Sequence, residues 1–122
     1  MTGPSEPKIF IVDDDEGVRD SLATLLKSEG WDVHAFENGR EFLEAFDVAE
    51  RGCLLLDLNM PIMGGREVVE ALLARECKIP VIVITSDDNA RINSGLLHLG
   101  VVKVLQKPLN HEALFEVINQ VV

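Results

Sequence analysis

The sequence has few cysteines, no long apolar segment and little positive charge, and each shortage excludes a class of protein. Its two cysteines, Cys53 and Cys77, lack the spacing of a metal site or of a CxxC pair. The chain also shows no secretory signal, so we expect a reducing, cytoplasmic compartment. The uninterrupted apolar runs, such as residues 9–12, are only a handful of residues long and too short to cross a bilayer.

Positive charge is scarce as well, because 11 lysines and arginines stand against 21 aspartates and glutamates and give a formal net charge of −10. Such an acidic surface repels the phosphates of nucleic acids and the headgroups of anionic lipids. We therefore expect no direct binding of this chain to nucleic acid or to a membrane. Its 122 residues have the length of one domain, which can bury a core without disulfides or a structural metal.

A short apolar run, a turn and a stretch with helical spacing recur along the chain. We predict a loose segment over residues 1–7 and one domain over residues 8–122. The apolar runs predict five strands, which we place at residues 9–12, 31–36, 53–56, 81–84 and 101–105. A helix is expected after each strand, with caps that include Asp15, Asn38 and Asn110.

Strands that alternate with helices form parallel sheets, because parallel neighbours need crossover connections. Three of the apolar runs do not alternate with polar residues, as is typical of strands covered by helices on both faces. The expected fold is an α/β domain with a doubly wound, five-stranded parallel sheet. Ligands of such sheets bind beyond the carboxyl ends of the strands, at the point where the strand order reverses.

The residues that follow these strands are acids, a hydroxyl and a lysine, namely Asp13, Asp14 and Asp15 after the first strand, Asp57 after the third, Thr85 after the fourth and Lys107 after the fifth. Helix capping explains Asp15 better than any chemistry does. Clustered carboxylates raise one another's pKa, so a compensating cation is expected. Mg²⁺ suits a site made of one or two carboxylates, waters and a phosphate.

Four motifs, in order and each at a strand end, resemble the receiver domains of bacterial two-component response regulators. They are Val12-Asp13-Asp14, Leu56-Asp57-Leu58-Asn59-Met60-Pro61 with Gly64, Ile84-Thr85 and Lys107-Pro108. The resemblance extends from residue 9 to about residue 121 and is nearest to regulators of the nitrogen-fixation type. It implies a flavodoxin-like strand order of 2-1-3-4-5.

The resemblance also implies a role for each acid. Asp57 would be the nucleophile that takes a phosphoryl group as an acyl phosphate. Mg²⁺ would be bound by Asp14 and Asp57, by the backbone carbonyl of Asn59 and, partly through water, by Asp13. The metal would neutralise the charge of the phosphoryl oxygens.

Lys107 would also neutralise the charge of the phosphoryl oxygens, and its peptide bond to Pro108 would be cis. Thr85 and Val104 would occupy the two switch positions of the family, where Thr85 donates its hydroxyl to the phosphoryl group. Receivers usually carry a tyrosine or phenylalanine at the second position, and a valine is too small and too stiff to replace it. The signal would then pass through the helix at about residues 89–99, which contains poor helix formers such as Gly95.

By this resemblance the chain is a phosphoacceptor signalling domain rather than an enzyme, although it would catalyse its own phosphorylation and dephosphorylation. The phosphoryl donor would be a sensor histidine kinase. Phosphorylation would switch protein contacts, either with a second copy of the chain in a dimer or with a downstream effector. Both a stand-alone receiver and a fragment of a longer, DNA-binding regulator are compatible with the sequence.

Three other interpretations conflict with specific residues of the chain. A phosphatase of the haloacid-dehalogenase type would also use an aspartate nucleophile with Mg²⁺, but it needs an acid at the position of Asn59. A flavodoxin-like cofactor carrier would have a loop rich in serine, threonine and glycine where this chain has three aspartates. A pseudo-receiver that only binds partners would lack Asp57, Asp14 or Lys107, and all three are present.

Overall fold

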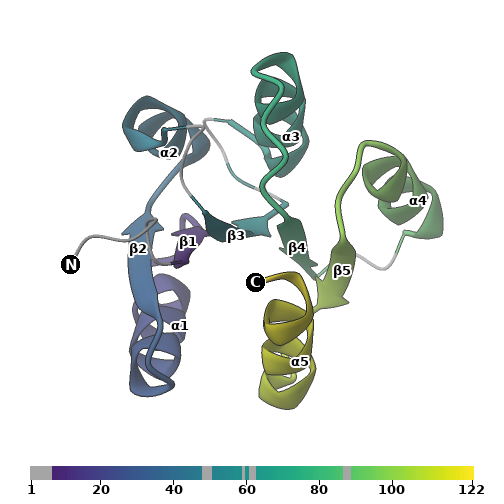
Figure 1. Cartoon of the computed structure of the whole chain (residues 1–122). Helices are drawn as coiled ribbons and strands as arrows, with labels where there is room; N and C mark the ends of the chain where they lie inside the picture. Colours follow the sequence, from purple (N-terminus) through teal and green to yellow (C-terminus); the bar gives the residue numbers. More distant parts are fainter. Residues whose placement is uncertain (1–6, 48–50, 59, 61–62, 87–88) are drawn as a thin grey trace.

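The computed structural model describes residues 7–47, 51–58, 60, 63–86 and 89–122. In these residues strands and helices alternate along the whole chain (Figure 1). The strands are β1 (Lys8–Val12), β2 (Asp32–Phe36), β3 (Gly52–Asp57), β4 (Val81–Thr85) and β5 (Lys103–Gln106). The helices are α1 (Glu16–Ser28), α2 (Gly39–Ala45), α3 (Gly65–Ala74), α4 (Ala90–His98) and α5 (His111–Val121). The loose segment predicted for residues 1–7 lies, except for Pro7, outside the described residues.

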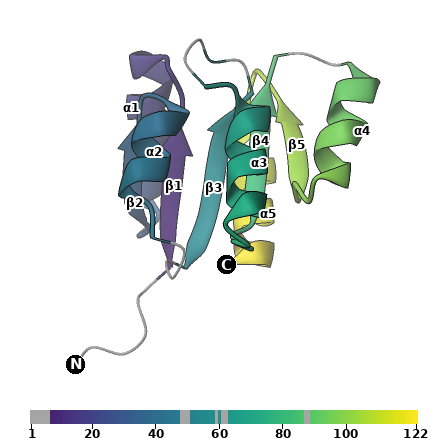
Figure 2. The same cartoon turned by 90° about the horizontal axis from the view of Figure 1, so that it is seen from above.

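All neighbouring strands pair in parallel, in the order β2-β1-β3-β4-β5, which confirms the predicted fold and strand order. Helices α1 and α5 cover one face of the sheet, and α2, α3 and α4 cover the other (Figure 1). The strand arrowheads end at a common edge (Figure 2), so the residues that follow each strand are brought to one side of the domain. No helix within the described ranges is long and apolar enough to span a bilayer.

The strands divide the core into two clusters because their successive side chains point to opposite faces. On β1, Phe10 and Val12 pack in the cluster of α2, α3 and α4, while Ile9 and Ile11 pack in the cluster of α1 and α5. All four side chains are at most 4% exposed. Both faces are therefore buried, which explains why the strands have apolar runs without polar alternation.

Four of the five helices begin at side-chain caps close to the edge where the strands end, whereas α3 begins after Gly64, which has no side chain to cap it. Asp15, Asn38 and Asn110 each accept a hydrogen bond from a backbone amide of the first helical turn, as predicted. Asn89 caps α4 in the same way. A cap of this kind stabilises a helix by about 1 kcal/mol, so these residues fix where each helix starts relative to the edge.

Two strands start later than predicted, because the residues expected to begin them form hydrogen bonds at the C-terminal ends of the preceding helices. The amide of Trp31 donates to the carbonyl of Leu26, and the amide of Val101 donates to the carbonyl of Leu96. Both bonds span five residues and close the end of a helix, α1 and α4 respectively. β2 therefore begins at Asp32 and β5 at residue 103.

Gly52 permits the close pairing of β1 and β3, and its replacement tests that constraint. Its φ is +136°, and a Cβ atom there would overlap the carbonyl oxygen of Lys8, its partner in the ladder. We expect Gly52→Ala to lower the free energy of unfolding by about 3 kcal/mol or more, since overlap adds to backbone strain. Gly30 is the matched control, with φ +92° and no atom within 4 Å of an added Cβ.

For Gly30→Ala we expect a loss of about 1 kcal/mol, from the left-handed backbone alone. Urea unfolding followed by circular dichroism measures both variants. Equal losses in the two variants would show that the contact with Lys8 does not constrain the sheet.

Candidate functional site

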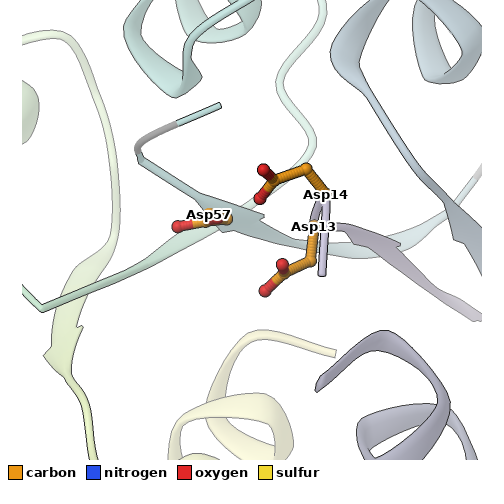
Figure 3. Close-up of side chains that lie close together, drawn as sticks. All are labelled: Asp13, Asp14 and Asp57. Carbon is orange, nitrogen blue, oxygen red and sulfur yellow. The ribbon is translucent and has the colours of Figure 1, made fainter. Parts of the chain in front are cut away.

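The register of β1 and β3 brings two carboxylates to the same level at the edge of the sheet. Val12 is paired with Leu56, so the next residues, Asp13 and Asp57, lie side by side where the two strands end. Both are buried, with 3% and 7% of their surface exposed. The side chains of Asp13 and Asp14 diverge from the end of β1, and both extend toward Asp57 (Figure 3).

Asp13, Asp14 and Asp57 form a cluster that can hold a metal ion. One carboxylate oxygen from each lies within 4.8 Å of the other two, and Asp14 is exposed while its neighbours are buried. Around an octahedral Mg²⁺ with bonds of about 2.1 Å, ligand oxygens are separated by about 3 to 4.2 Å. The cluster therefore needs little rearrangement to fit this ion, and oxygen is the ligand that Mg²⁺ prefers.

Lys107 brings a positive charge to the cluster. Its Nζ lies 3.8 Å from Asp13 Oδ2 and 3.8 Å from Asp57 Oδ1, so it pairs with both buried acids. The Lys107 amide donates to the carbonyl of Thr85 at 2.8 Å, which ties the segment after β5 to the end of β4. The peptide bond between Lys107 and Pro108 is cis, as the resemblance implies.

Thr85 ends β4 and is completely buried. Because Asp57 is paired with Ile84, Thr85 lies one residue beyond the level of Asp57 at the same edge. Asn59 lies outside the described residues, and Val104 is a half-buried residue of β5 that packs against the core cluster of α2, α3 and α4.

Burial raises the pKa of Asp13 above its ordinary value of 3.8. Two contacts act in the opposite direction, namely the hydrogen bond from the Asp15 amide to Asp13 Oδ1 at 2.9 Å and the positive charge of Lys107. The negative charges of Asp14 and Asp15 add to the increase. Burial prevails, so ionised Asp13 destabilises the folded protein until a cation offsets its charge.

One residue of the site was missed in the sequence. Arg19, on α1, donates a hydrogen bond from Nη1 to the backbone carbonyl of Asp13 at 2.8 Å. The sequence contained a usable signal, because Arg19 follows the cap residue Asp15 by one helical turn and so returns to the level of the loop. The contact itself could not be predicted, since its acceptor is a backbone atom.

Comparison with known proteins agrees with this geometry. The profile of the response regulator receiver domain matches residues 9–119. The transcriptional regulatory protein TdiR of Thauera aromatica is 35% identical over 111 residues, which are 91% of this chain and 49% of TdiR. The transcriptional regulatory protein FixJ of Bradyrhizobium diazoefficiens is 31% identical over 93% of this chain and 56% of its own length. The chain thus spans about half the length of these relatives.

Solved structures agree as well. The response regulator StyR superposes with a TM-score of 0.90 at 37% identity, covering 96% of this chain and 59% of StyR. The structure titled FixJ-N has a TM-score of 0.88 at 32% identity and covers 96% of this chain and 94% of that one. Both comparisons involve nearly the whole described domain.

The raised pKa of Asp13 predicts how stability depends on pH in metal-free solution. The folded protein binds this proton more readily than the unfolded chain, so ionising Asp13 costs stability as the pH rises from 3.8 through the raised pKa. Asp13→Asn keeps an oxygen for the Asp15 amide and removes the charge. We expect a higher free energy of unfolding than wild type at pH 7, and a smaller difference as the pH falls toward 4.

Urea unfolding with a chelator at several pH values measures this difference. Added Mg²⁺ should favour the wild type and reduce the advantage of the variant. An Asp13→Asn protein that is no more stable than wild type at pH 7 without metal would contradict the stated cause of the shift.

Proposed function

Because the chain belongs to the response regulator receiver domain family, we propose that Asp57 is the residue on which this domain accepts its phosphoryl group. Receivers are the phosphoacceptor signalling modules of two-component systems. One observation supports Asp57 above the other two acids: it ends β3, the central strand, and so lies between the acids that follow β1 and Thr85 at the end of β4.

In the proposed reaction, a carboxylate oxygen of Asp57 attacks the phosphorus atom of the donor. A new P–O bond forms, and the bond from phosphorus to the donor nitrogen or oxygen breaks, with its electron pair leaving on the donor. Asp14, Asp57 and the backbone carbonyl of Asn59 would hold Mg²⁺, with Asp13 acting partly through water, and the ion would supply positive charge beside the phosphoryl oxygens. The product is an acyl phosphate on Asp57.

Lys107 and Thr85 serve the same transfer from the other side. In the structure the Lys107 ammonium group lies between two carboxylates and compensates their charge. Once Asp57 is phosphorylated, the same ammonium group would pair with a phosphoryl oxygen. Thr85 lies at the adjoining strand end, and its hydroxyl would donate to another phosphoryl oxygen. These roles are charge stabilisation and orientation, so we propose self-catalysed phosphorylation and hydrolysis rather than an enzyme acting on external substrates.

The proposed donor is a sensor histidine kinase, and the proposed compartment is the cytoplasm. A groove beside the acidic cluster suits the approach of such a partner. It runs between α1 and the segment before α5 and is lined by apolar residues, including Leu22, Leu25 and Leu109, with Asp15 and Lys107 at its margin. A phosphorylated side chain presented from this groove would be close to Asp57.

Replacing Asp57 tests its role directly. We expect Asp57→Asn to lose the gain of one phosphoryl mass that wild type shows with acetyl phosphate and Mg²⁺, because an amide is a poor nucleophile. Intact-mass spectrometry measures this gain, with Asp20→Asn, an exposed change on α1, as the control that keeps it. A phosphoryl mass that persists in Asp57→Asn would place the acceptor elsewhere.

We also propose that phosphorylation acts on the surface formed by α4 and β5, altering self-association or effector binding. Helix α4 contributes one fully buried side chain among those described, that of Leu96, and it contains Gly95. Ile92 and Leu97 on this helix, and Val102 beside β5, are 38%, 50% and 43% exposed. A helix with so few buried contacts, joined to Thr85 by a short segment, is one that a ligand can reorder.

Gly95 allows this idea to be tested by stabilising α4. A Cβ atom there would lie 3.6 Å from Arg66 Nη1, an ordinary contact, so Gly95→Ala should stabilise the helix by about 1 kcal/mol. We expect slower hydrogen exchange over residues 90–105 and a smaller change there when a beryllofluoride mimic is added. Thr24→Ala, which raises helix propensity on α1 instead, is the matched control.

The outcome that contradicts the proposal is a mimic-induced change of the same size in wild type and Gly95→Ala. A change confined to other elements, with residues 90–105 unaffected in wild type, would also exclude α4 as the responding segment.

A further inference from the structure

Arg19 joins α1 to the loop that carries the acidic cluster. Its own amide donates to the carbonyl of the cap residue Asp15 at 2.9 Å, so its backbone is fixed one turn into the helix. From there its Nη1 reaches back to the carbonyl oxygen of Asp13 at 2.8 Å. A hydrogen bond from a charged donor at this length is of the stronger kind.

This bond completes the set of contacts that hold Asp13 in place. The Asp13 amide donates to the carbonyl of Phe36 at 3.2 Å, and Oδ1 accepts from the amide of Asp15 at 2.9 Å. Oδ2 faces Lys107 at 3.8 Å. The carbonyl lies one residue beyond the last ladder pair of β1, so Arg19 supplies the donor that the sheet no longer provides.

The carbonyl of Asp13 belongs to the planar peptide group that leads to Asp14. Because the peptide group is rigid, the direction of this carbonyl fixes where the Cα of Asp14 lies. Asp14 is the exposed member of the cluster, and its carboxylate has no burial to hold it in position. Arg19 thus restrains the exposed carboxylate of the cluster, that of Asp14, through the backbone.

The positive charge of Arg19 cannot by itself favour cation binding at the neighbouring cluster. A guanidinium repels a metal ion, and Arg19 lines a cleft together with three acids, Glu37, Glu41 and Glu44. If its charge alone mattered, its removal would tighten cation binding. If its hydrogen bond matters, removal loosens the loop and weakens binding. The two roles therefore predict effects of opposite sign.

We propose that Arg19 is a positioning residue that orients the peptide between Asp13 and Asp14 so that the cluster can bind a divalent cation. This inference rests on the magnesium site proposed above. It names a role for a residue that does not touch the cation and that lies on a helix outside the strand ends.

Titration with Mg²⁺ alone, by calorimetry and by amide NMR shifts, tests the inference on the whole chain. We expect Arg19→Ala to bind Mg²⁺ about tenfold more weakly than wild type or worse, the loss usual for a residue that orients a metal ligand. Arg19→Lys keeps a donor and a charge and should recover much of the affinity. Arg40→Ala removes an exposed positive charge from the first turn of α2, and it should bind at least as tightly as wild type.

A second measurement separates positioning from general damage to the fold. The rate of phosphorylation by acetyl phosphate should need more Mg²⁺ in Arg19→Ala but reach the wild-type value once Mg²⁺ is saturating. Should Arg19→Ala fail to fold, Arg19→Gln replaces it, because its shorter side chain loses the reach to the Asp13 carbonyl, and the same loss of affinity is expected.

Unchanged or tighter Mg²⁺ binding in Arg19→Ala, or in Arg19→Gln where it replaces Arg19→Ala, would overturn the inference. So would a phosphorylation rate that stays low at saturating Mg²⁺. If the wild type itself bound no Mg²⁺, the proposed function would fail along with the inference. Wild-type binding with no loss in the variants would remove the inference alone.

Discussion

The repulsion among three carboxylates at one edge of the sheet is the constraint on which the rest of the site depends. The register of β1 and β3 forces Asp13 and Asp57 together, and the loop adds Asp14 within 4.8 Å. Lys107 compensates the two buried acids but lies 3.8 Å from each, and the pKa of Asp13 stays raised. The fold thus keeps an unsatisfied negative field where a cation and a phosphoryl group would be bound. The repulsion among these carboxylates lowers the stability of the folded domain, and the same negative charge favours binding of a cation.

Most of the fold could be predicted because its signals are local or follow from simple packing rules. Apolar runs without alternation identified the strands, and short polar side chains such as Asn38 and Asn110 identified the helix starts. The errors came from backbone hydrogen bonds at helix ends. Val101 and Trp31 are apolar residues next to strands, but their amides close the preceding helices. The pattern of apolar side chains does not indicate which carbonyl accepts the hydrogen bond of a given backbone amide.

The candidate site was predictable to the extent that it consists of residues at strand ends. Asp13, Asp14, Asp57 and Lys107 were each found in this way, and the structure brings them together. Arg19 was not found, because it acts on a backbone carbonyl and lies on a helix. Val104 shows the opposite case, since its residue type alone indicated that the response must differ from that of receivers with an aromatic residue there. It packs, partly buried, against the core cluster of α2, α3 and α4, and the altered response stays a prediction.

Chemical trapping of the acyl phosphate is the sharpest test of Asp57 as the carrier of the phosphoryl group. Borohydride reduces an aspartyl phosphate to homoserine, so tandem mass spectrometry of the digested, phosphorylated wild-type chain locates the modified residue. We expect homoserine at position 57 and at no other aspartate, and only when Mg²⁺ was present during phosphorylation. Homoserine at position 13 or 14, or trapping that is independent of Mg²⁺, would contradict this expectation.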